Sequence, residues 1–188
     1  MKLDGTSETR LLFLYPGFAE SVRKIIDRMH LEFGFEMKIT ETVRTFERQR
    51  KLYSQGRDTI GPIITRARTG LSLHHYGLAA DVCFQGSDPY LDRGLMKAWD
   101  DLGLCTVGFD VRWGGRFAFA DKPHIEARYP VPLEQIISEY KIGGIPGVWA
   151  TIDKVRGVPV GRGWHDLGAT ARLMNPGTLS EGEASVYG

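Results

Sequence analysis

The stretch Ser72-Leu73-His74-His75-Tyr76-Gly77-Leu78-Ala79-Ala80-Asp81-Val82-Cys83-Phe84 joins a polar segment with two histidines directly to an apolar run. Residues 78–84 are short and mostly apolar, which predicts a buried β-strand. His74 lies at the end of a long irregular segment, and Asp81 lies inside the predicted strand. A turn between them could therefore bring both side chains to one metal ion.

The segments before this strand carry patterns of helix, strand and loop. Residues 17–33 predict an amphipathic helix, because their apolar residues recur at helical spacing and a glycine follows. Residues 37–39 alternate as in a half-buried strand. A second helix is expected over 45–55, with a threonine as its N-cap. Residues 57–77 show no sustained period and predict a long loop, a feature that is often functional.

The segments after the strand also predict both helices and strands. A third helix is expected to begin at Asp88 and Pro89 and to end at Gly103, because it has cap residues and an apolar stripe. Short strands are expected over 105–109 and around 124–128. One more helix is expected over 132–140, and the glycine-rich run that follows it, residues 143–147, predicts a break.

These elements predict an α+β fold in which helices pack against a small antiparallel sheet. A chain of 188 residues suffices for one compact domain and a short appendage. We expect a domain over residues 1–130 and a C-terminal extension over 131–188, made of a helix and a weakly patterned tail. Trp149 and Trp164 are expected to anchor that extension by packing.

Composition limits the classes of function. The formal net charge of +1 gives no electrostatic argument for a nucleic-acid partner. No apolar run approaches the roughly 20 residues of a membrane span, and the first residues do not resemble a secretory signal. Cys83 and Cys105 match neither a zinc pair nor a redox motif, so we predict small buried core residues. A disulfide between them is left open.

Potential metal ligands occur in two clusters, residues 72–81 and Asp121-Lys122-Pro123-His124-Ile125-Glu126. Imidazole nitrogen and carboxylate oxygen are good zinc ligands, and a catalytic zinc site uses about three of them and leaves a position for water. The spacing alone is weak evidence, since each histidine by itself fits a surface or hydrogen-bonded role. The complete pattern is more specific.

Every fixed position of the pattern Ser-x-His-x-x-Gly-x-Ala-x-Asp is present, followed forty residues later by Asp-x-x-His. The stretches 42–57 and 113–117 fit the same family. Over residues 17–128 the chain resembles the D-Ala-D-Ala carboxypeptidases and L-alanyl-D-glutamate endopeptidases, in the group that includes lysostaphin and the hedgehog zinc domain. The resemblance implies that the sheet carries a zinc site.

The resemblance also implies a role for individual residues. One Zn²⁺ ion would be held by His74, Asp81 and His124. Asp121 matches the catalytic carboxylate, Arg44 matches an arginine near the substrate carbonyl, and Ser72 matches a serine that lines the substrate site. A structural salt bridge remains the alternative for Arg44, and a turn-forming role remains the alternative for Asp121.

Two neighbours of the ligands have the right chemistry but different expected roles. We expect His75 to point away from the metal if His74 faces it. In a strand that begins at His124, Glu126 would lie on the same face as His124. Glu126 could act as an alternative base or support the ligand, and the resemblance favours Asp121 as the base.

The function that follows is hydrolysis of a stem-peptide amide bond in bacterial peptidoglycan, and we favour the bond between L-Ala and D-Glu. The branch resembled includes bacteriophage endolysins and related bacterial wall enzymes. We expect an endolysin that stays in the host cytoplasm until its release to the wall causes bacteriolysis, and a bacterial enzyme exported by other means is the alternative. We also expect a monomer. The alternatives are a D-Ala-D-Ala carboxypeptidase or dipeptidase, a non-catalytic zinc-bearing wall-binding module, and a purely structural zinc domain. The last fits poorly, because structural zinc sites usually have four protein ligands and many cysteines.

Overall fold

The structure is a computed structural model that describes residues 3–86, 96–162 and 164. The chain forms two compact units. The first comprises Met1–Thr42 and Leu78–Tyr129, and the second comprises Val43–Gly77 and Pro130–Gly188.

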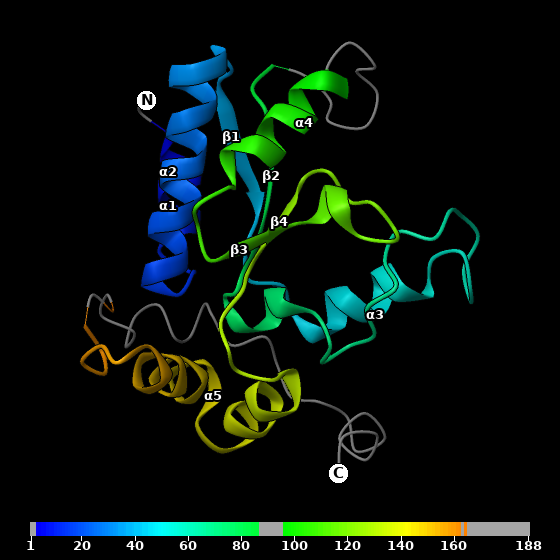
Figure 1. Ribbon diagram of the computed structural model, residues 1–188. Coiled ribbons are helices and arrows are strands. Elements are labelled where there is room, and N and C mark those ends of the chain that lie inside the picture. Colours follow the sequence, from blue (N-terminus) through cyan, green and yellow to red (C-terminus); the bar gives the residue numbers. More distant parts are fainter. Residues whose placement is uncertain (1–2, 87–95, 163, 165–188) are drawn as a thin grey trace. The chain divides into compact units, whose positions relative to one another are not determined.

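The first unit is built on an antiparallel sheet of four strands in the order β1-β2-β4-β3 (Figure 1). The strands are β1 (Met37–Glu41), β2 (Ala79–Phe84), β3 (Val111–Trp113) and β4 (His124–Ala127). The predicted α+β class with a small antiparallel sheet is therefore confirmed.

The strand register separates polar from apolar side chains. Asp81 pairs with His124 across β2 and β4, and Arg112 pairs with Glu126 across β3 and β4. Side chains alternate between the two faces of a strand, so these four lie on one face of the sheet. The alternate positions are buried and apolar, and they include Ile39, Val82, Phe84 and Ile125.

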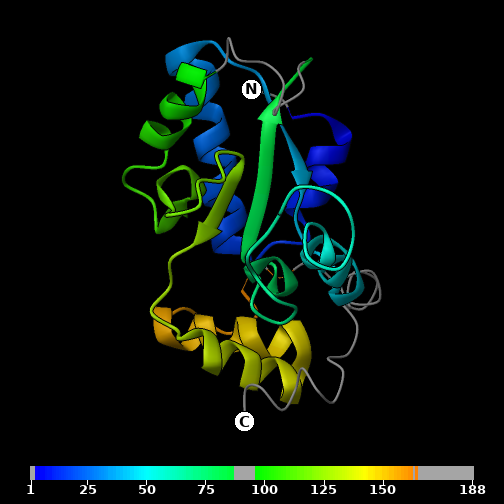
Figure 2. The ribbon, with the colours of Figure 1, turned by 90° about the vertical axis from the view of Figure 1, so that its right-hand side faces the viewer.

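Among the described residues of the first unit, three α-helices accompany the sheet: α1 (Gly5–Leu11), α2 (Pro16–Phe33) and α4 (Met96–Cys105). Helix α2 begins with a proline in its first turn and ends at Gly34, whose φ of 74° needs the left-handed region that glycine tolerates. Helices α2 and α4 lie side by side in Figures 1 and 2. The ring of Trp99 in α4 packs edge-on against Phe84 of β2, with centroids 4.6 Å apart.

Two predictions around the third helix were wrong. Helix α4 does not end at Gly103 but continues to Cys105, and residues 106–110 are turns rather than a strand. Gly103 serves close packing, because a Cβ atom there would lie 2.4 Å from the ring of Trp113. The predicted start of the helix at Asp88 and Pro89 lies outside the described residues. Cys83 and Cys105 are both buried, and no disulfide joins them.

The second unit contains α3 (Phe46–Ser54), the 3₁₀ helix η1 (Leu73–Tyr76) and α5 (Leu133–Arg156). Thr45 caps α3 as predicted, since its side chain accepts a hydrogen bond from the backbone N–H of Arg48. The segment between α3 and η1 is irregular, as its sequence predicts.

Helix α5 is longer than the sequence predicts. The expected break is a kink at Gly144, whose φ of 61° and ψ of −157° are not helical. The chain then resumes as a second helical piece, visible in Figure 2, which buries Val148, Trp149 and Ile152. The glycines and proline at the kink interrupt the periodic pattern, so the second piece was not expected. Trp149 is buried, as predicted, and its ring lies 5.8 Å from that of Trp164.

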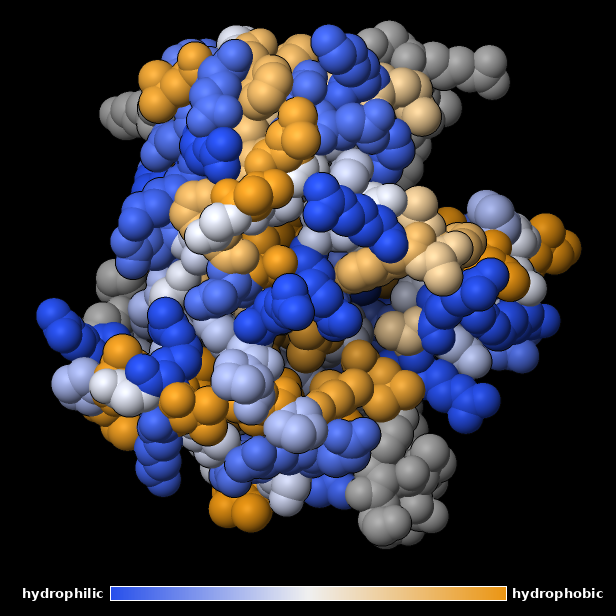
Figure 3. Space-filling model, in the orientation of Figure 1, coloured by the Kyte–Doolittle hydropathy of each residue, from blue (hydrophilic) through white to orange (hydrophobic). Residues whose placement is uncertain are grey.

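On the face shown in Figure 3, hydrophilic and hydrophobic residues are interspersed. This mixture is ordinary, because apolar atoms contribute much of the surface of a folded protein. None of the described helices is long and apolar enough to cross a membrane.

Candidate metal centre

His74 is placed by the short helix η1, which ends at Gly77 with a left-handed φ of 67°. Its imidazole is buried, and its backbone carbonyl accepts a hydrogen bond from the N–H of Arg44 at 3.2 Å. The helical turn directs consecutive side chains differently. His75 is accordingly occupied elsewhere: its Nδ1 lies 2.8 Å from the carbonyl of Arg44, and its ring packs on Phe46.

Aromatic side chains of the second unit hold η1 in place. The indole N–H of Trp149 donates to the carbonyl of Tyr76 at 2.9 Å, and the hydroxyl of Tyr76 donates to the carbonyl of Gly70 at 2.7 Å. The ring of Tyr140 packs edge-on against Phe46 and Tyr76. Helix α5, which supplies Trp149 and Tyr140, therefore supports the turn that presents His74.

Asp81 and His124 are placed by the sheet. They are directly opposite each other in β2 and β4, and Asp81 Oδ1 lies 3.0 Å from His124 Nδ1. Opposite residues of an antiparallel pair have their Cβ atoms about 5 Å apart, which suits two ligands of one ion. The register alone thus brings these two side chains together.

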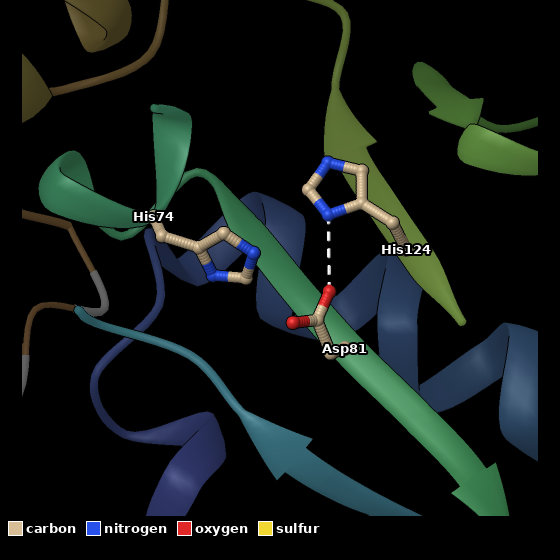
Figure 4. A group of neighbouring side chains, drawn as sticks. All are labelled: His74, Asp81 and His124. Atoms are coloured by element: carbon tan, nitrogen blue, oxygen red, sulfur yellow. Dashed lines mark hydrogen bonds and ion pairs between the residues drawn. The ribbon is translucent and has the colours of Figure 1, made fainter. Parts of the chain in front are cut away.

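His74, Asp81 and His124 each offer one ligand atom, and all these atoms lie within 4.8 Å of one another. Figure 4 shows the three side chains pointing toward a common point. Ligands of a tetrahedral zinc ion are about 3.3 Å apart, given bonds of about 2.0 Å, so a small contraction would complete the coordination. Two imidazoles and one carboxylate also match the donor chemistry of catalytic zinc sites. The group fits a divalent metal ion.

Glu126 and Arg112 extend the polar face beyond the ligands. Glu126 Oε2 lies 3.1 Å from His124 Nε2, and the guanidinium of Arg112 forms an ion pair with Glu126 Oε1. Burial opposes a charge on His124, but the hydrogen bonds to Asp81 and Glu126 outweigh it and raise the pKa of His124 to about 10. Burial also opposes the charge of Glu126, but its contacts with His124 and Arg112 lower its pKa.

Without a metal ion, the two carboxylates therefore favour the protonated form of His124. A metal ion binds the neutral imidazole, so it must replace the proton on the nitrogen that it takes. Nδ1 faces Asp81, and Nε2 faces Glu126. This arrangement leaves Nδ1 as the nitrogen that can share an ion with Asp81.

Asp121 lies in a turn that is fixed from several sides. Its carbonyl accepts the backbone N–H of His124 at 3.1 Å, and its own N–H donates to the carbonyl of Gly114 at 2.9 Å. The indole of Trp113 donates to the carbonyl of Lys122 at 2.7 Å, and the carbonyl of Pro123 accepts from Val82 in β2 at 3.0 Å. The backbone around Asp121 is thus tied to the ligand His124. The catalytic role of Asp121 remains a prediction.

Gly114 makes the closest approach to this turn. A Cβ atom at Gly114 would lie 2.3 Å from the carbonyl oxygen of Asp121 and 2.9 Å from Cβ of His124. We therefore expect Gly114→Ala to displace the turn and weaken metal binding by about 10- to 100-fold, as loss of ligand support does. Titration with Zn²⁺ against a chromophoric chelator measures the effect.

The matched control is Gly143→Ala, since a Cβ atom there meets nothing within 4 Å. This variant should bind Zn²⁺ as the unmodified protein does. Equal affinity of both variants would show that the close contact at Gly114 does not position the ligand.

Arg44 and Ser72 are both buried. The guanidinium of Arg44 donates to Gln49 Oε1 at 3.0 Å, and the carbonyl of Ser72 accepts from the N–H of His75 at 3.1 Å. Their roles toward a substrate remain predictions. Arg112 was not predicted as a site residue, because no strand was expected over residues 111–113. A polar residue between the apolar Val111 and Trp113 was the available signal.

Comparisons with known proteins identify a matching family and two similar peptidases. Residues 65–127 match the family described as D-alanyl-D-alanine carboxypeptidase. The peptidoglycan L-alanyl-D-glutamate endopeptidase CwlK of Bacillus subtilis (strain 168) is 38% identical over 104 residues, which cover 50% of this chain and 61% of that protein. The match thus spans less than two thirds of the relative's length.

The L-Ala D-Glu endopeptidase ChiX of Serratia marcescens has a similar fold, with a TM-score of 0.50 and 19% sequence identity. The match covers 68% of this chain and 90% of that structure. The segment with the family match contains all three candidate ligands and Asp121. Residues 65–127 are therefore similar to the D-alanyl-D-alanine carboxypeptidase family in the segment that carries the candidate ligands.

Proposed function

We propose that this protein is a zinc-dependent peptidoglycan hydrolase that cleaves the amide bond between L-Ala and D-Glu of the stem peptide. The observation that carries the proposal is the convergence of His74, Asp81 and His124 on one point. The 38% identity to an L-alanyl-D-glutamate endopeptidase favours this bond over others.

Zinc is the metal that we propose for the site. Two imidazoles with one carboxylate suit zinc and several other transition ions, whereas magnesium and calcium prefer sites made of oxygen ligands. When bound, the ion supplies a Lewis acid for the scissile carbonyl and lowers the pKa of a water molecule toward about 7.

The chain's own residues perform the remaining steps. Asp121 accepts the proton of the attacking water and delivers it to the leaving amine of D-Glu, so that the C–N bond breaks without expelling an unstable anion. Arg44 supplies a fixed positive charge for the carbonyl oxygen, which becomes negative as the tetrahedral intermediate forms. Ser72 contributes a polar contact to the substrate.

A second candidate is a D-Ala-D-Ala carboxypeptidase, because the matching family carries that description. The two activities use the same chemistry but differ in the product. An endopeptidase exposes a new amino terminus on D-Glu, whereas the carboxypeptidase releases free D-Ala.

The test is mass spectrometry of the fragments that the purified protein releases from peptidoglycan. We expect stem-peptide fragments that begin with D-Glu and no free D-Ala. Release of D-Ala would assign the carboxypeptidase activity, and intact peptidoglycan after incubation with the folded, zinc-loaded protein would refute the proposed hydrolase.

We further propose that the protein acts as a monomeric bacteriophage endolysin, held in the host cytoplasm until it reaches the wall. The family resemblance of the motifs supports this placement. Production in bacterial cells with and without a membrane-pore protein tests it: lysis is expected with both proteins together. Lysis by the hydrolase alone would contradict the need for release.

A further inference from the structure

We propose that Glu126, fixed by Arg112, is a positioning residue that holds the imidazole of His124 with Nδ1 toward the metal. The inference rests on the proposed metal site and adds residues that the ligand pattern does not contain. Every contact that carries it lies within the sheet of the first unit.

The geometry assigns one nitrogen of His124 to each neighbour. Nδ1 lies 3.0 Å from Asp81 Oδ1, and Nε2 lies 3.1 Å from Glu126 Oε2. The two nitrogens are on different edges of the ring, so the Glu126 carboxylate contacts the edge away from Asp81. Glu126 is therefore placed to accept the Nε2–H proton when Nδ1 binds a metal ion. A ligand histidine commonly donates its second N–H to such a carboxylate, which fixes the tautomer and the ring orientation.

The placement of Glu126 also separates it from the role of general base. Its Oε2 is occupied by His124, and its Oε1 is paired with Arg112. A base must reach the attacking water, whereas this carboxylate has both oxygens engaged on the far edge of the ring. The sequence left two roles open for Glu126, an alternative base or a support for the ligand His124. The structure favours the second role.

The carboxylate of Glu126 is buried beside its partners. The side chain of Glu126 is 11% exposed, whereas that of Arg112 is 57% exposed. A carboxylate at this depth is stable only with charged or hydrogen-bonding partners, and Arg112 provides one from the adjacent strand. Arg112 pairs with Glu126 in the strand register, so the backbone places the cation opposite the carboxylate. The result is a chain of contacts from Arg112 through Glu126 to His124 and Asp81.

Loss of Glu126 would free the ring of His124 to turn about its χ2 torsion. A half-turn replaces Nδ1 by a ring carbon, which cannot bind a metal ion. We expect Glu126→Ala to weaken Zn²⁺ binding by about 10- to 100-fold, the usual effect of removing such a partner. Glu126→Gln keeps an oxygen that can accept from Nε2–H, so its affinity should recover part of the loss. Arg112→Ala leaves the carboxylate in place and should cause a smaller loss.

The experiment measures the Zn²⁺ dissociation constant of the full chain by competition with a chromophoric chelator. The absorption spectrum of the Co²⁺-loaded protein reports ligand geometry independently of activity. Glu32→Ala is the matched control, because Glu32 is also paired with an arginine, Arg28, but lies in α2. This variant should bind Zn²⁺ unchanged. Circular dichroism of each variant verifies that the fold is retained.

We expect the unmodified protein and Glu32→Ala to bind Zn²⁺ most tightly. Arg112→Ala and Glu126→Gln should bind it more weakly, and Glu126→Ala should bind it most weakly. Unchanged affinity and an unchanged Co²⁺ spectrum in Glu126→Ala would overturn the inference alone. If Glu126→Ala does not fold, unchanged affinity in both Glu126→Gln and Arg112→Ala overturns it instead. Failure of the unmodified protein to bind Zn²⁺ would overturn the proposed metal site as well, so the two failures are distinguishable.

Discussion

His74→Ala is expected to lose its bound metal ion and, with it, hydrolysis of peptidoglycan. The site offers only three ligand atoms among the described residues, so removal of one leaves a pair that cannot retain zinc against dialysis. The loss of Zn²⁺ affinity should exceed the roughly 100-fold loss that follows removal of a residue hydrogen-bonded to a metal ligand. Metal content by atomic absorption should fall from about one ion per chain toward zero, and the rate of fragment release should fall below detection.

Two other histidines provide controls for this variant. His30 lies in α2, where its Nδ1 has no hydrogen-bond partner, so His30→Ala should retain both metal and activity. His75→Ala should lower the free energy of unfolding, because it removes the contact with Arg44 and the packing on Phe46. It should still bind about one metal ion per chain. Full metal content in His74→Ala would show that His74 is not a ligand.

The sequence predicted the elements that bear the ligands because their signals are local. Residues 78–84 form an apolar run with Asp81 inside it, and a short apolar run between turns predicts a buried strand. The helix over Pro16–Phe33 has both a periodic apolar face and a terminal glycine. The α+β class follows from these elements, since the strands are few and helices separate them.

The sequence misplaced elements where a residue has a tertiary role. Gly103 resembles a helix terminator, yet it lies inside α4. A glycine is needed there because the ring of Trp113 leaves no room for a side chain. Gly144 does interrupt α5, but the chain beyond it resumes a helix that buries Trp149 against Tyr76. Neither packing partner is near in sequence, so no local pattern could indicate either contact.

The residues of the candidate site also differ in whether a local sequence pattern reveals them. The ligand pattern was visible as motif residues, whereas the contact of Glu126 with His124 depends on side-chain orientation within β4. The pairing of Glu126 with Arg112 depends on the register of β3, a strand that was not predicted from the sequence. A one-residue change of register would send Arg112 to the opposite face. Local sequence patterns therefore do not predict how distant strands pair, and this pairing places Arg112 beside Glu126.

Asp121→Ala is expected to lower kcat by about 100- to 10,000-fold while the metal content stays at about one ion per chain. The substitution removes the carboxylate that would move the proton from water to the leaving amine. It keeps the backbone N–H and carbonyl through which Asp121 contacts Gly114 and His124. Initial rates on purified peptidoglycan, with Zn²⁺ content measured on the same samples, provide both quantities.

The combination of metal content and rate separates an enzyme from a zinc-bearing binding module. His74→Ala should lose both the ion and turnover, whereas Asp121→Ala should lose only turnover, because a proton-transfer group is not a ligand. Asp110→Ala is the control, since Asp110 is an exposed aspartate of the same unit and contacts Arg128 through its backbone carbonyl. Equal rates for Asp121→Ala and the unmodified protein would remove Asp121 from the mechanism. Hydrolysis would then require another proton acceptor, because the three ligands are occupied by the ion and Glu126 is engaged by His124 and Arg112.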